Sequence, residues 1–139
     1  MPELGKYEKV PRPESIQFFL SRVGGHPKVT DVEQIDKQLF LVKKTNRRNL
    51  RVFLTNYYVV SEAEVYEIMS QHKDLNCIIT ISMWNSYSNS GKTAAANNGI
   101  ALFKINEFMG ALYVDGEKFI NFITREERER REREAKRGH

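Results

Sequence analysis

The chain of 139 residues has one cysteine and three histidines, and this scarcity excludes several classes of protein. The lone Cys77 can form neither an internal disulfide nor a cysteine-based metal cluster. No apolar run approaches the ~18–20 residues of a membrane-spanning helix, and the first residues lack the apolar stretch of a signal peptide. We therefore expect a cytoplasmic protein without a disulfide scaffold, a zinc finger or a membrane segment.

Hydrophobic residues make up 40% of the chain, which is enough for one buried core and argues against wholesale disorder. Three of the four prolines lie within the first 13 residues, where no hydrophobic period is visible. The last residues alternate in charge and contain no aliphatic stripe. We expect an N-terminal arm over 1–13, a single domain over 14–124 and a charged helical or frayed tail over 125–139.

Three segments have the pattern of helices. Apolar residues from Ile16 to Val23 follow a helical period after Pro13 and before a Gly-Gly stop. Ser61 and Glu64 form a Ser-x-x-Glu capping box that predicts a helix to about His72. The sequence GKTAAANN can form a short third helix, and NEFMGAL can add one or two helical turns.

Five segments have the pattern of strands, in the ranges 27–36, 36–44, 50–60, 75–84 and 99–105. The second and third flank a polar turn and predict an antiparallel hairpin. The fourth and fifth are apolar throughout and are separated by the short helix, which predicts a parallel crossover. The fold expected is α/β, a small mixed sheet flanked by helices. Residues 113–122 look like an edge hairpin around Asp115-Gly116 or a packing extension.

Positive charge is concentrated on the predicted hairpin. Between Asp36 and Glu62 there is no acidic residue, and six basic residues lie there. Basic hairpins with nearby aromatic side chains can bind nucleic acid, because cations contact phosphates and aromatic rings stack on bases. The alternative is that the charges protect a sheet edge from aggregation. The candidate phosphate ligands are Lys43, Lys44, Arg47, Arg48, Arg51 and also Lys92, with Tyr57, Tyr58, Trp84 and Tyr87 as the aromatic candidates.

The segment Ser90-Gly91-Lys92-Thr93 follows an apolar strand and opens a helix, as the end of a nucleotide-binding P-loop does. However, Ser86 stands where that loop needs its first glycine, and the following helix is short. We therefore interpret the segment as a polar helix start. Lys92 near a helix N-terminus can still meet a phosphate.

The ranges 39–69 and 77–105 read LFLVKKTNRRNLRVFLTNYYVVSEAEVYEIM and CIITISMWNSYSNSGKTAAANNGIALFKI. With the preceding helix and strand, their pattern resembles the restriction-endonuclease-like superfamily, the PD-(D/E)XK nucleases, most closely their Mrr-type and Holliday-junction-resolvase-like cores. The resemblance implies a magnesium site built from an Asp near the second strand and a Glu/Gln-x-Lys on the third.

The chain departs from that family at the metal site. Asp36 is the only candidate for the metal-binding Asp, and Leu54-Thr55-Asn56 occupies the place of Glu/Gln-x-Lys. One carboxylate and an amide would hold magnesium poorly. A displaced carboxylate from Glu14, Glu62 or Glu64 could restore the site, although the last two are better explained by the capping box.

These observations predict a catalytically inactive nuclease-like domain that binds nucleic acid or a protein partner, with no cofactor and no metal. The alternatives are an active nuclease in which Asp36 and a displaced Glu hold magnesium, or a purely structural, oligomerising protein. A homodimer is expected, because a high apolar content in a short chain often accompanies self-association.

Overall fold

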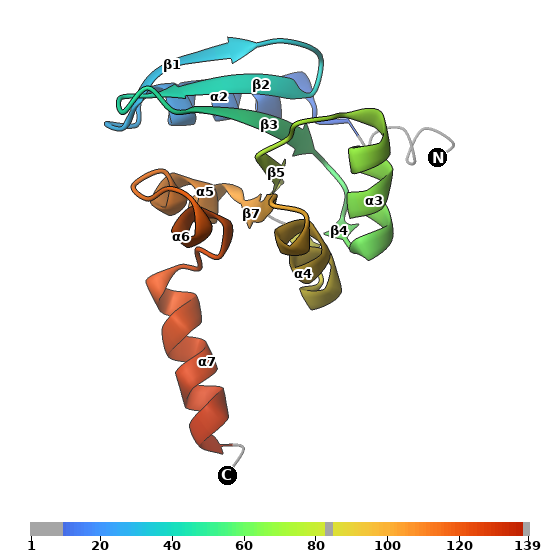
Figure 1. Cartoon of the computed structure of the whole chain (residues 1–139), viewed down its shortest axis with the longest axis vertical. Helices are drawn as coiled ribbons and strands as arrows, with labels where there is room; N and C mark the ends of the chain where they lie inside the picture. Colours follow the sequence, from blue (N-terminus) through green and yellow to red (C-terminus); the bar gives the residue numbers. More distant parts are fainter. Residues whose placement is uncertain (1–9, 83–84, 138–139) are drawn as a thin grey trace.

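A mixed five-stranded sheet lies at the centre of the computed structural model, which describes residues 10–82 and 85–137 (Figure 1). Its strand order is β1-β2-β3-β5-β7. The first three strands are antiparallel neighbours, whereas β3, β5 and β7 run parallel. The α/β fold, the hairpin and the parallel crossover expected from the sequence are confirmed. The strands are β1 (Val29–Gln34), β2 (Leu39–Lys44), β3 (Asn49–Thr55), β5 (Cys77–Thr80) and β7 (Ala101–Lys104).

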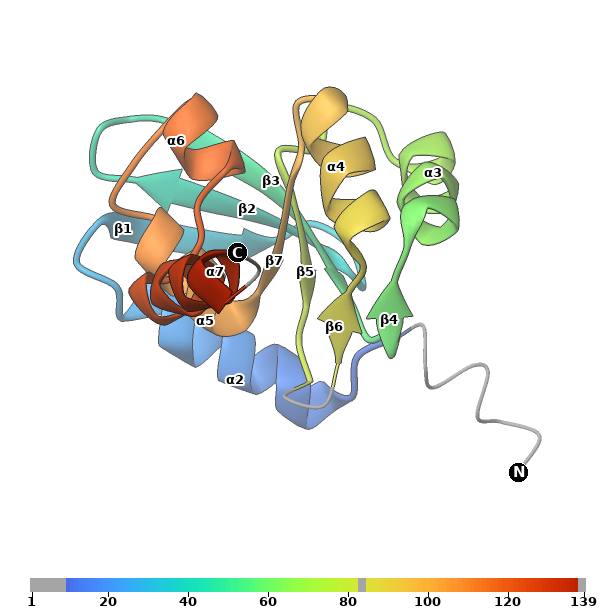
Figure 2. The same cartoon turned by 90° about the horizontal axis from the view of Figure 1, so that it is seen from below.

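Helices cover both faces of the sheet (Figure 2). One core cluster joins the sheet to α2 (Pro13–Gly24), α5 (Ile105–Ala111) and α6 (Glu117–Ile120). The other cluster joins it to α3 (Glu62–Gln71) and α4 (Asn89–Asn97). A short parallel pair, β4 (Val59–Val60) and β6 (Ser86–Tyr87), lies beside α3 and α4.

Local sequence explains where the helices begin and how they pack. α2 starts at Pro13 and buries Phe19 and Val23 against the sheet. α3 begins after Ser61, whose backbone N–H donates to Glu64 Oε1 at 2.9 Å as the capping box predicted. The strand β5 is buried at every position, as expected of a strand that helices cover on both faces.

The prediction of an edge hairpin for residues 113–122 is wrong. Gly116 adopts a positive φ of 64° and starts the helical turn α6, whose Phe119 enters the core. The alternative, a packing extension, describes the segment correctly. The chain then continues as α7 (Arg125–Arg137), in which no residue is buried. Most of the expected N-terminal arm and Trp84 lie outside the described residues. None of the helices in the described part of the chain combines the length and hydropathy of a membrane span.

Candidate nucleic-acid interface

The sheet has two ends that carry different side chains. At its amino end, where β3, β5 and β7 begin, lie the α2–β1 loop, the β2–β3 turn and the α5–α6 connection; they gather on the left of Figure 1. At its carboxyl end, where the same strands finish, lie the β1–β2 turn and the starts of α2 and α3. The basic residues predicted from the sequence lie mainly at the amino end.

Arg47 and Arg48 are exposed in the β2–β3 turn. Arg47 has φ 69°, a left-handed conformation that glycine or asparagine adopts more readily. The Asn46 side-chain oxygen accepts the backbone N–H of Arg48 at 3.0 Å and helps to hold the turn. The turn therefore presents two arginines to solvent, one of them at a position where a side chain is sterically disfavoured.

Lys43 and Lys44 are not free cations, although the segment between Asp36 and Glu62 contains no acidic residue of its own. The Lys44 side chain is 3% exposed, and its Nζ lies 2.7 Å from Asp115 Oδ1. The same ammonium donates to the Val114 carbonyl at 3.1 Å. Lys43 Nζ lies 3.7 Å from Glu33 and 4.0 Å from Asp31 on the neighbouring strand. These carboxylates come from β1 and from the α5–α6 connection.

Arg51 is half-buried on β3 at the same end of the sheet. Its backbone N–H donates to the Asn76 side chain at 2.8 Å. Its buried Nε has no hydrogen-bond partner among the described residues. Lys28, in the α2–β1 loop, is exposed, and its carbonyl accepts the Thr45 N–H at 3.0 Å. We call Lys28, Arg47, Arg48 and Arg51 the basic turn surface.

The aromatic candidates Tyr57 and Tyr58 do not join this surface. Tyr57 and Tyr58 follow β3 at the carboxyl end, roughly 20 Å from the β2–β3 turn for a strand of this length. Burial raises the pKa of Tyr57 to about 12, with a further contribution from the neighbouring Glu67. The sequence places basic and aromatic residues close together, but the intervening extended strand separates them.

Lys92 points into the protein. Its Nζ donates to the Leu102 carbonyl on the edge strand β7 at 2.7 Å and lies 4.5 Å from the Phe103 ring centroid. Desolvation lowers its pKa. Its amine is thus already engaged, which weakens its candidacy as a phosphate ligand. The preceding Gly91 also has a packing role, because a Cβ there would lie 2.5 Å from the Val60 carbonyl oxygen.

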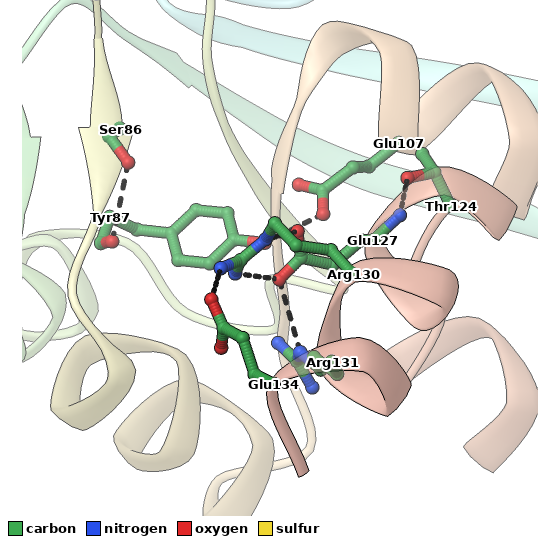
Figure 3. A network of polar contacts seen from close by, with 8 residues as sticks. All are labelled: Ser86, Tyr87, Glu107, Thr124, Glu127, Arg130, Arg131 and Glu134. Atoms are coloured by element: carbon green, nitrogen blue, oxygen red, sulfur yellow. Dashed lines mark hydrogen bonds and ion pairs between the residues drawn. The ribbon is translucent and has the colours of Figure 1, made fainter. Parts of the chain in front are cut away.

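A polar network lies between β6, α5 and α7 (Figure 3). The Tyr87 hydroxyl donates to the buried Glu107 at 2.7 Å, and burial together with this bond raises the Tyr87 pKa. On α7, the Glu127 carboxylate accepts hydrogen bonds from Arg130 and Arg131, which lower its pKa to about 2. The network pairs arginines of α7 with glutamates of the same helix, so they offer phosphates less net charge than the basic turn surface.

The residues that the resemblance aligns with the metal site of PD-(D/E)XK nucleases do not fit a magnesium ion. Asp36 is exposed in the β1–β2 turn, where its Oδ1 accepts the Lys37 N–H at 2.8 Å. Thr55 is buried, and its hydroxyl accepts the Tyr57 N–H at 3.4 Å. The Asn56 side chain accepts a hydrogen bond from Asn85 at 2.9 Å. The described residues contain no group of three His, Cys, Asp or Glu side chains that could hold a metal ion.

The displaced carboxylates do not gather at this position. Glu14 lines an open cleft of about 770 Å³ at the carboxyl end together with Thr80 and Lys104. Glu64 is held by the Ser61 capping box, and the Glu62 side chain is exposed in the first turn of α3. This arrangement offers neutral and singly charged groups where a divalent cation needs several oxygen anions.

Sequence reasoning missed two residues of the amino end. Lys28 lies in a loop that is distant in sequence from the hairpin, and only tertiary contacts bring it there. Tyr113 is 57% exposed after α5, and its ring lies 4.6 Å from that of His26. The sequence signal that could have identified Tyr113 is its position two residues before the Asp115-Gly116 turn. Comparison with family models, with curated proteins and with solved structures found no match to this chain.

Proposed function

We propose that this chain is a non-catalytic nucleic-acid-binding domain and that the basic turn surface contacts the phosphates. The observation that carries the proposal is the exposure of Lys28, Arg47 and Arg48 at one end of the sheet. No side chain of the basic turn surface forms an ion pair with a residue in the described ranges. Unpaired surface cations on adjoining loops suit a backbone of regularly spaced negative charges.

The backbone of Arg47 supports the same proposal. A non-glycine residue at φ 69° costs roughly 1–2 kcal/mol in comparison with an ordinary conformation. A charged side chain at a position that glycine would occupy without strain points to selection for something other than stability. Phosphate binding by the guanidinium accounts for this choice.

We further propose that the fold is a nuclease-like core without its metal site. The order helix, strand, hairpin, helix and strand, with β3 and β5 parallel, is the order that the resemblance to PD-(D/E)XK nucleases implies. The departure at Asp36, Thr55 and Asn56 favours binding over cleavage. On this proposal the chain keeps a nucleic-acid-binding scaffold and lacks the residues for metal-dependent cleavage.

The test is a titration of labelled oligonucleotides followed by fluorescence anisotropy at several salt concentrations. Four phosphate contacts predict a log–log salt slope of roughly −3 on single strands and somewhat steeper on duplex DNA. Replacing Arg47, Arg48 and Arg51 by Gln should flatten this slope by roughly two. The control replaces Arg128, Arg133 and Lys136 of α7 by Gln, which removes the same charge and should change the slope much less.

Arg47→Gly gives a sharper test because it separates binding from stability. Glycine accepts the turn conformation, so the free energy of unfolding should stay the same or rise by up to roughly 1 kcal/mol, while affinity falls. Binding that is lost only with the α7 variant, or the absence of any salt-dependent binding, would overturn the proposed function.

A further inference from the structure

One exposed aromatic ring lies on the amino end beside the basic turn surface. Tyr113 follows α5 directly and is 57% exposed. Its ring packs against the ring of His26, with centroids 4.6 Å apart and planes inclined at 53°. The remainder of the tyrosine ring faces solvent and is available to a flat partner.

His26 forms a fixed support for this ring. It is only 6% exposed, and its Nε2 hydrogen-bonds to the Met109 carbonyl at 2.9 Å. Its Nδ1 accepts the backbone N–H of Lys28 at 3.0 Å. Because both ring nitrogens are engaged, the imidazole cannot turn without losing a bond. The fixed imidazole gives the Tyr113 ring a rigid surface to pack against, which reduces the conformational entropy that the tyrosine would lose on binding.

A closed chain of contacts connects Tyr113 to the arginines of the turn. Lys28, which bonds to His26, also accepts the N–H of Thr45 at 3.0 Å. Two residues after Tyr113, Asp115 accepts a hydrogen bond from Asn46 at 2.8 Å. Thr45 and Asn46 directly precede Arg47. The ring and the guanidinium groups thus belong to one surface whose loops are tied together on both sides.

We infer that Tyr113, supported by His26, stacks on an unpaired base and that the basic turn surface binds single-stranded nucleic acid in preference to duplex. This inference rests on the proposed function and names its substrate class. Proteins that bind single strands combine cations that contact the phosphates with aromatic rings on which any base can stack. In a duplex, each base is covered on both faces by its neighbours, so a surface ring gains no stacking partner.

The experiment compares oligothymidine, oligouridine and a mixed-sequence duplex by fluorescence anisotropy. Tyr113→Leu should weaken binding of both single strands by roughly 5- to 100-fold, which corresponds to the loss of one base stack. It should leave duplex binding and the salt slope unchanged, because no charge is removed. Tyr113→Trp should retain affinity, and its added indole fluorescence should be quenched when oligothymidine binds.

The matched control is Tyr58→Leu, which removes an exposed tyrosine from the carboxyl end of the sheet. It should leave all three affinities unchanged. Equal losses for Tyr113→Leu and Tyr58→Leu, or no loss for Tyr113→Leu, would overturn the stacking role. If binding is still salt-dependent and still lost with the arginine variant, the proposed function survives that result. If none of the three probes binds, both proposals fail.

Discussion

The ammonium of Lys44 and the carboxylate of Asp115, 71 positions apart in the sequence, form an ion pair of 2.7 Å that joins the β2–β3 hairpin to the α5–α6 connection. The two partners differ in environment, since the lysine side chain is 3% exposed and the aspartate side chain 33%. The pair holds Tyr113 and Arg47 on one surface, because each lies within three residues of a partner. Removing the aspartate and removing the lysine should therefore change the free energy of unfolding by different amounts. Loss of the ion pair affects both parts of the proposed interface.

Asp115→Ala should destabilise the protein more than Lys44→Met. The aspartate variant leaves a buried ammonium with the Val114 carbonyl as its remaining described partner, at a cost of about 3 kcal/mol. The methionine variant removes the buried charge and keeps most of the packing, so about 1 kcal/mol or less is expected. Urea unfolding of both variants measures the difference. Equal losses would contradict the asymmetric burial of the pair.

Gly91→Ala should destabilise the contact between α4 and β4. The added methyl would lie 2.5 Å from the Val60 carbonyl oxygen, a backbone atom that cannot move by itself. We expect a loss of about 2–3 kcal/mol in the free energy of unfolding. Gly24→Ala is the matched control, because a Cβ there meets nothing within 4 Å and the residue lies in α2. It should be neutral or stabilising by about 0.5–1 kcal/mol, and an equally tolerated Gly91→Ala would refute the packing role.

Acid should loosen α7 through Glu127. Hydrogen bonds from Arg130 and Arg131 lower the pKa of this carboxyl from 4.5 to about 2. A pKa that is lower in the helix than in the unfolded chain contributes stability above pH 4.5, and this contribution is lost as the pH falls toward 2. Amide hydrogen exchange of residues 125–137, followed by NMR, should therefore accelerate through that window.

Glu127→Gln should remove much of this acid-induced acceleration. Glu132→Gln is the control, since Glu132 forms no ion pair with the residues described in this helix. It should leave the pH dependence in place. A wild-type helix whose exchange rates stay constant between pH 4.5 and 2, after correction for intrinsic exchange, would contradict the role of the Glu127 hydrogen bonds.

The α/β fold class and most of the helices and strands could be predicted from the sequence because their signals are local. Pro13 and the Ser61 capping box mark helix starts, and the apolar run at Cys77–Thr80 marks a buried strand. Each depends on side chains within a few residues of one another. The wrong prediction of a hairpin at Asp115-Gly116 also rests on a local signal. The dipeptide favours a turn, but the burial of Phe119 in the core decides whether a strand or a helix follows.

The candidate site was harder to predict from the sequence because segments that are distant in the chain assemble it. The carboxylates that neutralise Lys43 and Lys44 come from β1 and from the α5–α6 connection. No local sequence pattern predicts either contact. The interior position of the Lys92 amine depends on how α4 packs against β7. Likewise, Tyr113 becomes a candidate only when His26, from the other end of the chain, is placed beside it.

Within residues 10–82 and 85–137, no cluster of carboxylates could hold a metal ion, and this has a direct consequence for cleavage chemistry. A metal-dependent nuclease holds its cation with several oxygen anions and uses a base or a lysine to activate water. At the corresponding end of this sheet, Asp36 bonds to its own turn, Thr55 is buried and Asn56 is paired with Asn85. Neither the charge nor the geometry for a bound magnesium is available from these residues.

We therefore expect no cleavage of linear, circular or branched DNA, or of RNA, in magnesium or manganese. Asp36→Asn is the decisive comparison, because it removes the one carboxylate that the family pattern aligns and keeps the size of the side chain. Wild type and variant should show the same background level of cleavage and the same nucleic-acid affinity, measured by gel assay and by anisotropy.

Metal-dependent products that disappear in Asp36→Asn would show that this exposed turn carries a functional metal ligand. The proposal of a non-catalytic domain would then be replaced by that of a nuclease with a rearranged site. Cleavage that persists in the variant would instead be traced by repeating the assay with Glu14→Gln, whose carboxylate lines the cleft at the same end of the sheet.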